Sequence, residues 1–163
     1  MITVPVGFVT DYASIPRAFC EFLPEQGRYS GPAIIHDFLY WKAECTQAQA
    51  DKIMFVAMTD AGVSDETRDT IYRALVRFGK PAFESNAHDR ADGLPRVIPV
   101  DYRNIPYDQS WPEYRKFLRA RGVPVDPREP VPPAYCAAGE KRFDEIQARK
   151  PKWWEFWKWW FWK

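Results

Sequence analysis

This chain has few histidines, few cysteines and almost no net charge, and each of these shortages excludes some classes of function. The chain has two histidines, three cysteines and a formal net charge of +1 across 163 residues. Cys20, Cys45 and Cys136 are too few and too scattered to predict a disulfide scaffold or a zinc site, and they suit synthesis in a reducing cytosol. The near-neutral charge balance lacks the basic excess that nucleic-acid binding needs, so we expect no nucleic-acid partner.

A secretory signal is also missing from the start of the sequence. The first ten residues, MITVPVGFVT, have neither a basic leading stretch nor a long apolar core. We therefore expect no cleaved leader on this chain.

Tryptophan is abundant, but almost all of it lies at one end. Six of the eight tryptophans fall in the last eleven residues, WWEFWKWWFWK. Tryptophan prefers the boundary between lipid and water, and lysine adds attraction to anionic lipid. This segment is too short to span a bilayer, which takes about 20 apolar residues. Its predicted membrane- or partner-binding residues are Trp153, Trp154, Trp157, Trp159, Trp160, Trp162, Lys158 and Lys163. Contact with a membrane surface is favoured, and a groove in a partner or packing within the chain remain open.

The fifteen prolines divide the chain into three zones. Residues 1–83 are predicted to form a compact core. Residues 84–138 are rich in proline and are expected to run as an extended arm with one short helix over residues 111–121. Residues 139–163 are predicted to hold a helix over residues 140–149 and the tryptophan-rich end.

The core is predicted to be mainly α, with a small β element. A helical pattern begins at Gly31, a second helix begins after Thr46 with a capping box, and a third begins after Ser64 and stops at Gly79. Residues 3–10 alternate apolar side chains with Pro and Gly, which indicates a short edge strand. We expect the first two helices to form an antiparallel pair.

One polar cluster in the core suggests chemistry. His36 and Tyr40 share a face of the first helix, and Asp51 lies near the start of the second. If the two helices are antiparallel, the Asp51 carboxylate can hold one imidazole nitrogen of His36 and make the other a base. Asp37 points to a different face, where its oxygens can bind a hard cation.

The order and spacing of three segments resemble the secreted phospholipase A2 family of bacteria and fungi. These segments are AIIHDFLY at residues 33–40, AD-x-x-x-F at residues 50–55 and IYRALVRFG at residues 71–79. The resemblance implies a three-helix core in which a bound Ca²⁺ polarises an ester carbonyl. It assigns His36 as the general base, Asp51 as its orienting carboxylate, Asp37 and Asp11 as calcium ligands, and Tyr40 and Tyr72 as supports of that carboxylate.

The chain departs from that family in two places. Ala33 replaces the disulfide-forming cysteine that precedes the catalytic histidine, and residues 11–24 contain no glycine for a backbone calcium loop. A structural interpretation is therefore also open. In that interpretation Asp37 caps the loop that begins at Thr10, and His36 bonds Asp51 only to anchor the fold.

A second resemblance covers residues 3–83. The run VPVGFVTDYASIPRAF, followed by HDFLY and AD-x-x-x-F, is similar to a family of unknown function in tailed phages and prophages. It implies a phage virion protein of the tail or tail tip, made in the host cytoplasm and acting at the bacterial envelope. Its expected partners are phage structural proteins within a larger assembly, and bacterial membrane lipid is a further candidate partner.

The sequence thus offers two functions. The first is a phage protein that hydrolyses phospholipid acyl esters with calcium. The alternative is a non-catalytic assembly protein whose tryptophan-rich end docks into a partner.

Overall fold

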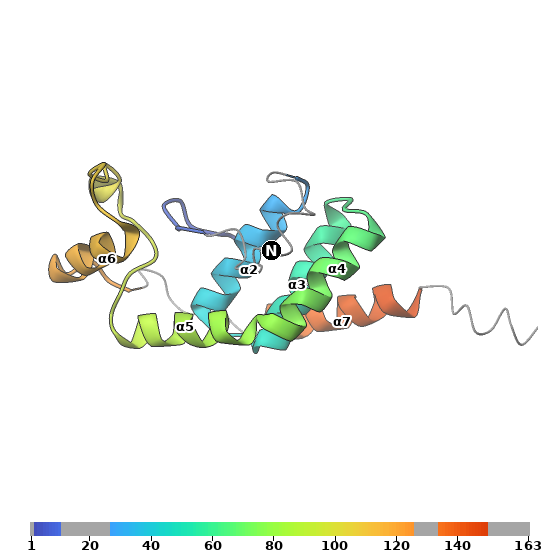
Figure 1. Cartoon of the computed structure of the whole chain (residues 1–163). Helices are drawn as coiled ribbons and strands as arrows, with labels where there is room; N and C mark the ends of the chain where they lie inside the picture. The colour runs from blue at the N-terminus through green and yellow to red at the C-terminus, as the bar shows by residue number, and fades with distance from the viewer. Residues whose placement is uncertain (1, 11–26, 126–133, 150–163) are drawn as a thin grey trace, which may run out of the picture.

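The computed structural model describes residues 2–10, 27–125 and 134–149. This part of the chain is mainly helical, as predicted, with six α-helices and one 3₁₀ turn (Figure 1). The helices are α2 (Ser30–Lys42), α3 (Gln47–Asp60), α4 (Asp65–Phe78), α5 (Lys80–Ala91), α6 (Trp111–Ala120) and α7 (Ala134–Ala148), and the 3₁₀ turn η1 is Val100–Tyr102.

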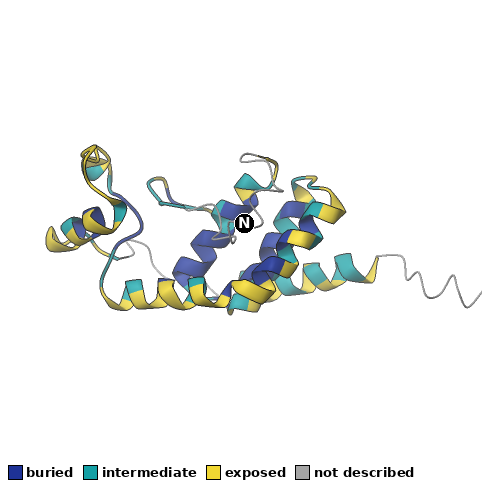
Figure 2. Cartoon of the chain, viewed as in Figure 1, coloured by how far each residue is buried: buried dark blue, intermediate teal, exposed yellow. Residues whose placement is uncertain are grey.

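Helices α2 and α3 form the centre of the molecule and are its most buried elements (Figure 2). Near the start of α2, Ala33 packs in one apolar cluster with Met54 and Met58 from the far half of α3. Near the end of α2, Tyr40 packs in a second cluster with Ala50 from the first turn of α3. Because the contacts run in opposite order along the two helices, α2 and α3 are antiparallel, as the sequence pattern predicts.

The predicted starts of two helices are confirmed by their caps. The Thr46 hydroxyl accepts a hydrogen bond from the Gln49 backbone N–H at 3.2 Å, and the Gln49 side chain accepts one from the Thr46 N–H at 3.1 Å. Ser64 caps α4 by accepting from the Thr67 N–H at 3.3 Å. Such caps satisfy backbone donors that the first helical turn leaves open, and each contributes about 1 kcal/mol.

Helix α5 corrects the expectation of an extended arm after residue 83. Gly79 does end α4, but α5 begins at the next residue, Lys80, and continues to Ala91. Pro81 lies in its first turn, where a missing N–H costs no helical hydrogen bond. Gly79 therefore ends one helix, and Pro81, two residues later, lies in the first turn of the next. The short helix predicted over residues 111–121 is confirmed as α6.

The edge strand predicted at residues 3–10 is wrong, since the described residues contain only one isolated antiparallel bridge, between Phe8 and Val97. Pro5 has no N–H to donate to a ladder. Gly7 has φ of +94°, which breaks the extended backbone, and a Cβ at this position would lie 2.3 Å from the Ile98 carbonyl oxygen.

Residues that follow α5 form a small third apolar cluster around Ile98, Tyr114 and Leu118. Arg115 of α6 is buried and joins this cluster to α2. Its guanidinium donates to the Pro95 and Leu94 carbonyls and lies 5.3 Å from the ring centre of Trp41, which has no exposed surface. A cation over the face of an indole is attracted by the ring's electrons.

Helix α7 begins at Ala134, earlier than the predicted residue 140, and packs on α3. A disulfide joins Cys136 of α7 to Cys45, with Cα atoms 5.6 Å apart and a sequence separation of 91. The three scattered cysteines predict no disulfide scaffold, and the pairing of Cys45 with Cys136 is not found from the sequence. A pairing across that separation depends on where α7 docks, which cysteine spacing does not reveal.

Candidate active site

The predicted pair of His36 and Asp51 is present at the interface of α2 and α3. Nε2 of His36 lies 2.8 Å from Oδ1 of Asp51, and the Tyr40 hydroxyl donates to the same oxygen at 2.7 Å. A carboxylate only accepts hydrogen bonds, so Nε2 carries the proton that faces Asp51. Asp51 thus fixes the orientation and the tautomer of the imidazole.

The other imidazole nitrogen makes no hydrogen bond to any of the described residues. Within the described part of the chain, Nδ1 of His36 and Oδ2 of Asp51 are buried without a hydrogen-bond partner. Buried polar atoms are nearly always paired, so each such atom calls for an explanation such as a bound water, an ion or a catalytic role. The free Nδ1 is where a general base would receive a proton.

The carboxylates of Asp37 and Asp51 determine how readily His36 is protonated. Burial lowers the pKa of His36, but Asp37 and Asp51 together outweigh burial and raise this pKa above its ordinary value. Oδ1 of Asp37 lies 4.0 Å from Nδ1, too far for a hydrogen bond but close enough for electrostatic attraction. His36 therefore takes up a proton readily, and a role as base requires a pH above this raised pKa.

Asp37, a predicted calcium ligand, is also buried. Its Oδ2 accepts a hydrogen bond from the Thr10 hydroxyl, which is the contact that the structural interpretation expects. Asp11, the second predicted ligand, lies outside the described residues. Over residues 2–10, 27–125 and 134–149, no group of three or more histidine, cysteine or acidic side chains is arranged to hold a metal ion. The described residues alone do not fit a calcium site.

The two predicted supporting tyrosines have different surroundings. Burial, together with the negative charge of Asp51, raises the pKa of Tyr40 well above its ordinary range, so Tyr40 remains a hydrogen-bond donor at physiological pH. The Tyr72 ring instead packs against Phe55, with ring centres 5.3 Å apart, and against Phe143 at 5.1 Å. Of the two tyrosines, Tyr40 is the one that donates a hydrogen bond to Asp51, and Tyr72 belongs to the neighbouring aromatic cluster.

Gly79 contributes to the site in a way that the sequence pattern did not show. A Cβ at this position would lie 2.4 Å from the Tyr40 hydroxyl oxygen and 2.6 Å from the Leu75 carbonyl oxygen. Only glycine leaves room for that hydroxyl to reach Asp51. The position was predicted as a helix end, which is correct, but the clash with Tyr40 depends on how α2 and α4 pack.

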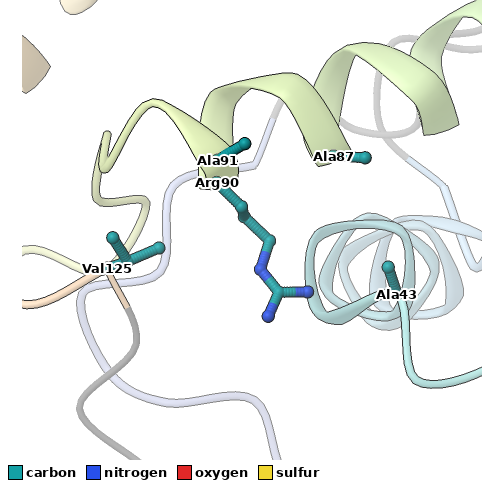
Figure 3. Close-up of a pocket in the computed structure, with 5 residues that line it drawn as sticks. All are labelled: Ala43, Ala87, Arg90, Ala91 and Val125. Atoms are coloured by element: carbon teal, nitrogen blue, oxygen red, sulfur yellow. The ribbon is translucent and has the colours of Figure 1, made fainter.

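His36 and Asp51 are each about 1% exposed. Two pockets formed by described residues lie elsewhere. One, of about 550 Å³, lies beside α5 and contains the Arg90 side chain (Figure 3). Arg90 donates to the Lys42 carbonyl, so its charge caps the C-terminal end of α2. The second, of about 270 Å³, lies between the N-terminal segment and the loop after α5. The first pocket is lined by Ala43, Ala87, Arg90, Ala91 and Val125.

The tryptophan-rich segment predicted to bind a membrane or a partner lies outside the described residues. None of the helices in the described part of the chain combines the length and the apolar character needed to cross a bilayer.

The fold and the site thus define a small helical domain built around a buried His–Asp–Tyr network. Residues 1–75, which contain α2, α3 and most of α4, match the model of a family described as a protein of unknown function (DUF1353). This part of the chain is a domain of that family. No curated protein and no solved structure matches the chain. The resemblance to phospholipase A2 and the phage origin therefore stay predictions.

Proposed function

We propose that this domain is a hydrolase in which His36 and Asp51 form a catalytic dyad that acts on acyl esters of phospholipid. The observation that carries the proposal is the placement of the imidazole. Asp51 binds Nε2 at 2.8 Å, and Nδ1 has no hydrogen-bond partner among the described residues. An oriented imidazole with one free nitrogen is what a general base needs.

The chemistry assigned to the dyad is the activation of water. Nδ1 of neutral His36 accepts a proton from a water molecule while the water oxygen attacks the ester carbonyl carbon. Breakage of the ester C–O bond then releases a fatty acid and an alcohol, and the proton on Nδ1 passes to the alcohol oxygen. Asp51 stabilises the imidazolium that forms, and Tyr40 holds Asp51 in place.

Calcium would polarise the ester carbonyl if it were bound beside Asp37. We assign it no step, because the described residues do not form a cation site. Calcium dependence is therefore one of the quantities that the experiment varies.

The proposed place of action is a bacterial membrane surface, with the protein in a phage tail or tail tip. Support comes from the sequence alone. The resemblance to a phage family suggests the virion, and the six tryptophans and the lysines near the C-terminus suggest contact with lipid headgroups.

A second candidate function is a non-catalytic assembly protein. The burial of His36 and Asp51 favours it, since a substrate reaches a base with about 1% exposure only if the site opens first. In this case the network anchors α2 to α3, and the tryptophan-rich end docks into a partner subunit.

Hydrolysis of phospholipid vesicles by the full chain tests the first proposal. Fatty acid release is measured with Ca²⁺ and with a chelator, for the natural protein and for His36→Gln. The matched control is His88→Gln, which changes the other histidine of the chain, an exposed residue of α5. We expect release to fall at least a hundredfold in His36→Gln and to be unchanged in His88→Gln, with both variants helical by circular dichroism.

The pH profile gives a second test of the same dyad. Because a base must be unprotonated and Asp37 and Asp51 raise the pKa of His36, hydrolysis should increase as pH rises through that pKa. Equal release by the natural protein and His36→Gln would exclude the dyad mechanism. Complete inactivity of the folded natural protein would favour the non-catalytic assembly protein. Capture by vesicles that is lost on truncation after Arg149 would separately support contact of the C-terminal segment with a membrane.

A further inference from the structure

Helix α7 is held to the core by one covalent bond and a group of partly exposed contacts. Cys136 is the one residue of α7 that is buried, at 3% exposure, and its disulfide partner Cys45 is 2% exposed. Cys45 lies in the connection between α2 and α3, so the disulfide ties α7 directly to the centre of the fold. In Figure 1 α7 lies at the end of the molecule opposite α6.

The polar contacts of α7 are weak anchors. Glu140 pairs with Lys52, but the Glu140 side chain is 39% exposed, and exposed ion pairs contribute little to stability. The Tyr135 hydroxyl donates to Glu44 at 2.9 Å in a partly buried position.

The aromatic contacts are stronger but few. Phe143 packs edge-on against Phe55, with ring centres 4.9 Å apart, and it remains partly exposed. A helix of 15 residues is marginal in water without tertiary support. Gly139 also packs closely on Ile53 of α3, where a Cβ would lie 2.3 Å from Cγ1 of Ile53. Among these contacts the disulfide is the covalent one, and it is the one that a change of redox conditions can remove.

We propose that the Cys45–Cys136 disulfide is a redox latch for α7. In the reaction, two thiolates of a dithiol or glutathione-type reductant attack in turn, the protein S–S bond breaks, and the reductant leaves as its own disulfide. Two protein thiols result, each with one proton, and the two electrons come from the reductant. A reducing cytosol holds the latch open, and an oxidising compartment or the outside of the cell closes it.

The latch controls more than α7. Residues 150–163, with the tryptophan-rich end, follow α7 directly in the chain. With the disulfide formed, the helix that precedes this segment is bound to the core. With the disulfide reduced, that helix is no longer covalently attached. The proposal does not depend on hydrolysis, because it concerns only the attachment of α7.

Access for a reductant comes from the start of the helix. Cys136 is in the first turn of α7, and helix ends open locally far more often than helix centres. Opening that single turn exposes the sulfur atoms without unfolding α2 or α3.

Amide hydrogen exchange on the full chain tests the latch. The protein is compared in air-oxidised form, after treatment with dithiothreitol, and as the double variant Cys45→Ser/Cys136→Ser. Cys20→Ser, which keeps the pair, is the matched control. We expect amides of α7 to exchange at least tenfold faster in the reduced protein and in the double variant, while amides of α2, α3 and α4 change less than threefold.

Three results would overturn the proposal. The first is the detection of free thiols at Cys45 and Cys136 by mass spectrometry of the air-oxidised protein, because the proposal requires a disulfide between them. Protection of α7 that stays within twofold after reduction means that the noncovalent contacts suffice. Loss of protection from amide exchange in α2, α3 and α4 together with α7 means that the disulfide stabilises the whole fold and not the docking of α7 alone. Reduction of the folded natural protein guards against a double variant that fails to fold.

Discussion

The coupling between His36 and Asp51 can be measured by a double-mutant cycle of His36→Ala, Asp51→Ala and the double variant. Both side chains are about 1% exposed, so each single change takes a partner from a buried group. Asp51→Ala removes the acceptor of the His36 Nε2 proton, and His36→Ala leaves Asp51 with the hydrogen bond from Tyr40 but without the imidazole. Breaking a buried pair in this way costs about 3–5 kcal/mol, whereas the double variant leaves no unpaired charge. We therefore expect the double variant to be more stable than the sum of the single effects predicts, by about 2–3 kcal/mol.

The same coupling should depend on pH, with a sign that follows from the direction of the pKa shift. Asp37 and Asp51 raise the pKa of His36 in the folded protein, after burial has lowered it. A raised pKa contributes stability that is complete below the unfolded value of about 6.5 and is lost as pH rises through the folded value. Urea unfolding at about pH 6 and about pH 9 should therefore give a larger coupling energy at the lower pH.

Tyr40→Phe separates the dyad from its support. It removes the 2.7 Å hydrogen bond to Asp51 but leaves the His36 contact, so it should cost about 1.5–3 kcal/mol with no change in the direction of the pH effect. Additive single effects, or a coupling energy that is equal at both pH values, would refute the interpretation of a charged, cooperative pair.

Three further substitutions test the packing around the site by thermal unfolding. Gly79→Ala places a Cβ 2.4 Å from the Tyr40 hydroxyl oxygen, so we expect a loss of about 1–3 kcal/mol, and an unchanged melting temperature would contradict the space argument. Thr46→Ala removes the cap of α3 and should cost about 1 kcal/mol, while Thr46→Ser, which keeps the hydroxyl, serves as the control. Gly139→Leu puts a Cβ 2.3 Å from Cγ1 of Ile53 and should cost about 1–3 kcal/mol in the oxidised protein; no loss would mean that α7 packs less closely on α3 than described.

Local signals predicted several elements correctly. Thr46 and Ser64 cap helices at the predicted positions, because capping depends on a side chain and a backbone N–H three residues apart. The contact between His36 and Asp51 was also predicted, since a short connection between two helices leaves them antiparallel and brings these positions together.

Other features required the folded chain. Gly79 and Pro81 were interpreted as the end of regular structure, although a proline in a first turn also starts a helix. The strand predicted at residues 3–10 failed because its partner segment offers a single bridge, at Val97. A strand forms only when it pairs with a second segment, and the position of that segment depends on the tertiary structure.

The amino-acid sequence by itself determined the helical class, the starts of α3 and α4 and the pairing of His36 with Asp51, because these depend on neighbours within a few turns. Only the tertiary structure decided that Cys45 meets Cys136, that Thr10 engages Asp37, and that Nδ1 of His36 has no hydrogen-bond partner among the residues that the structure describes. These features depend on segments far apart in the chain, which come together through the shared burial of apolar surface, and apolar burial is not directional enough to be read from local spacing.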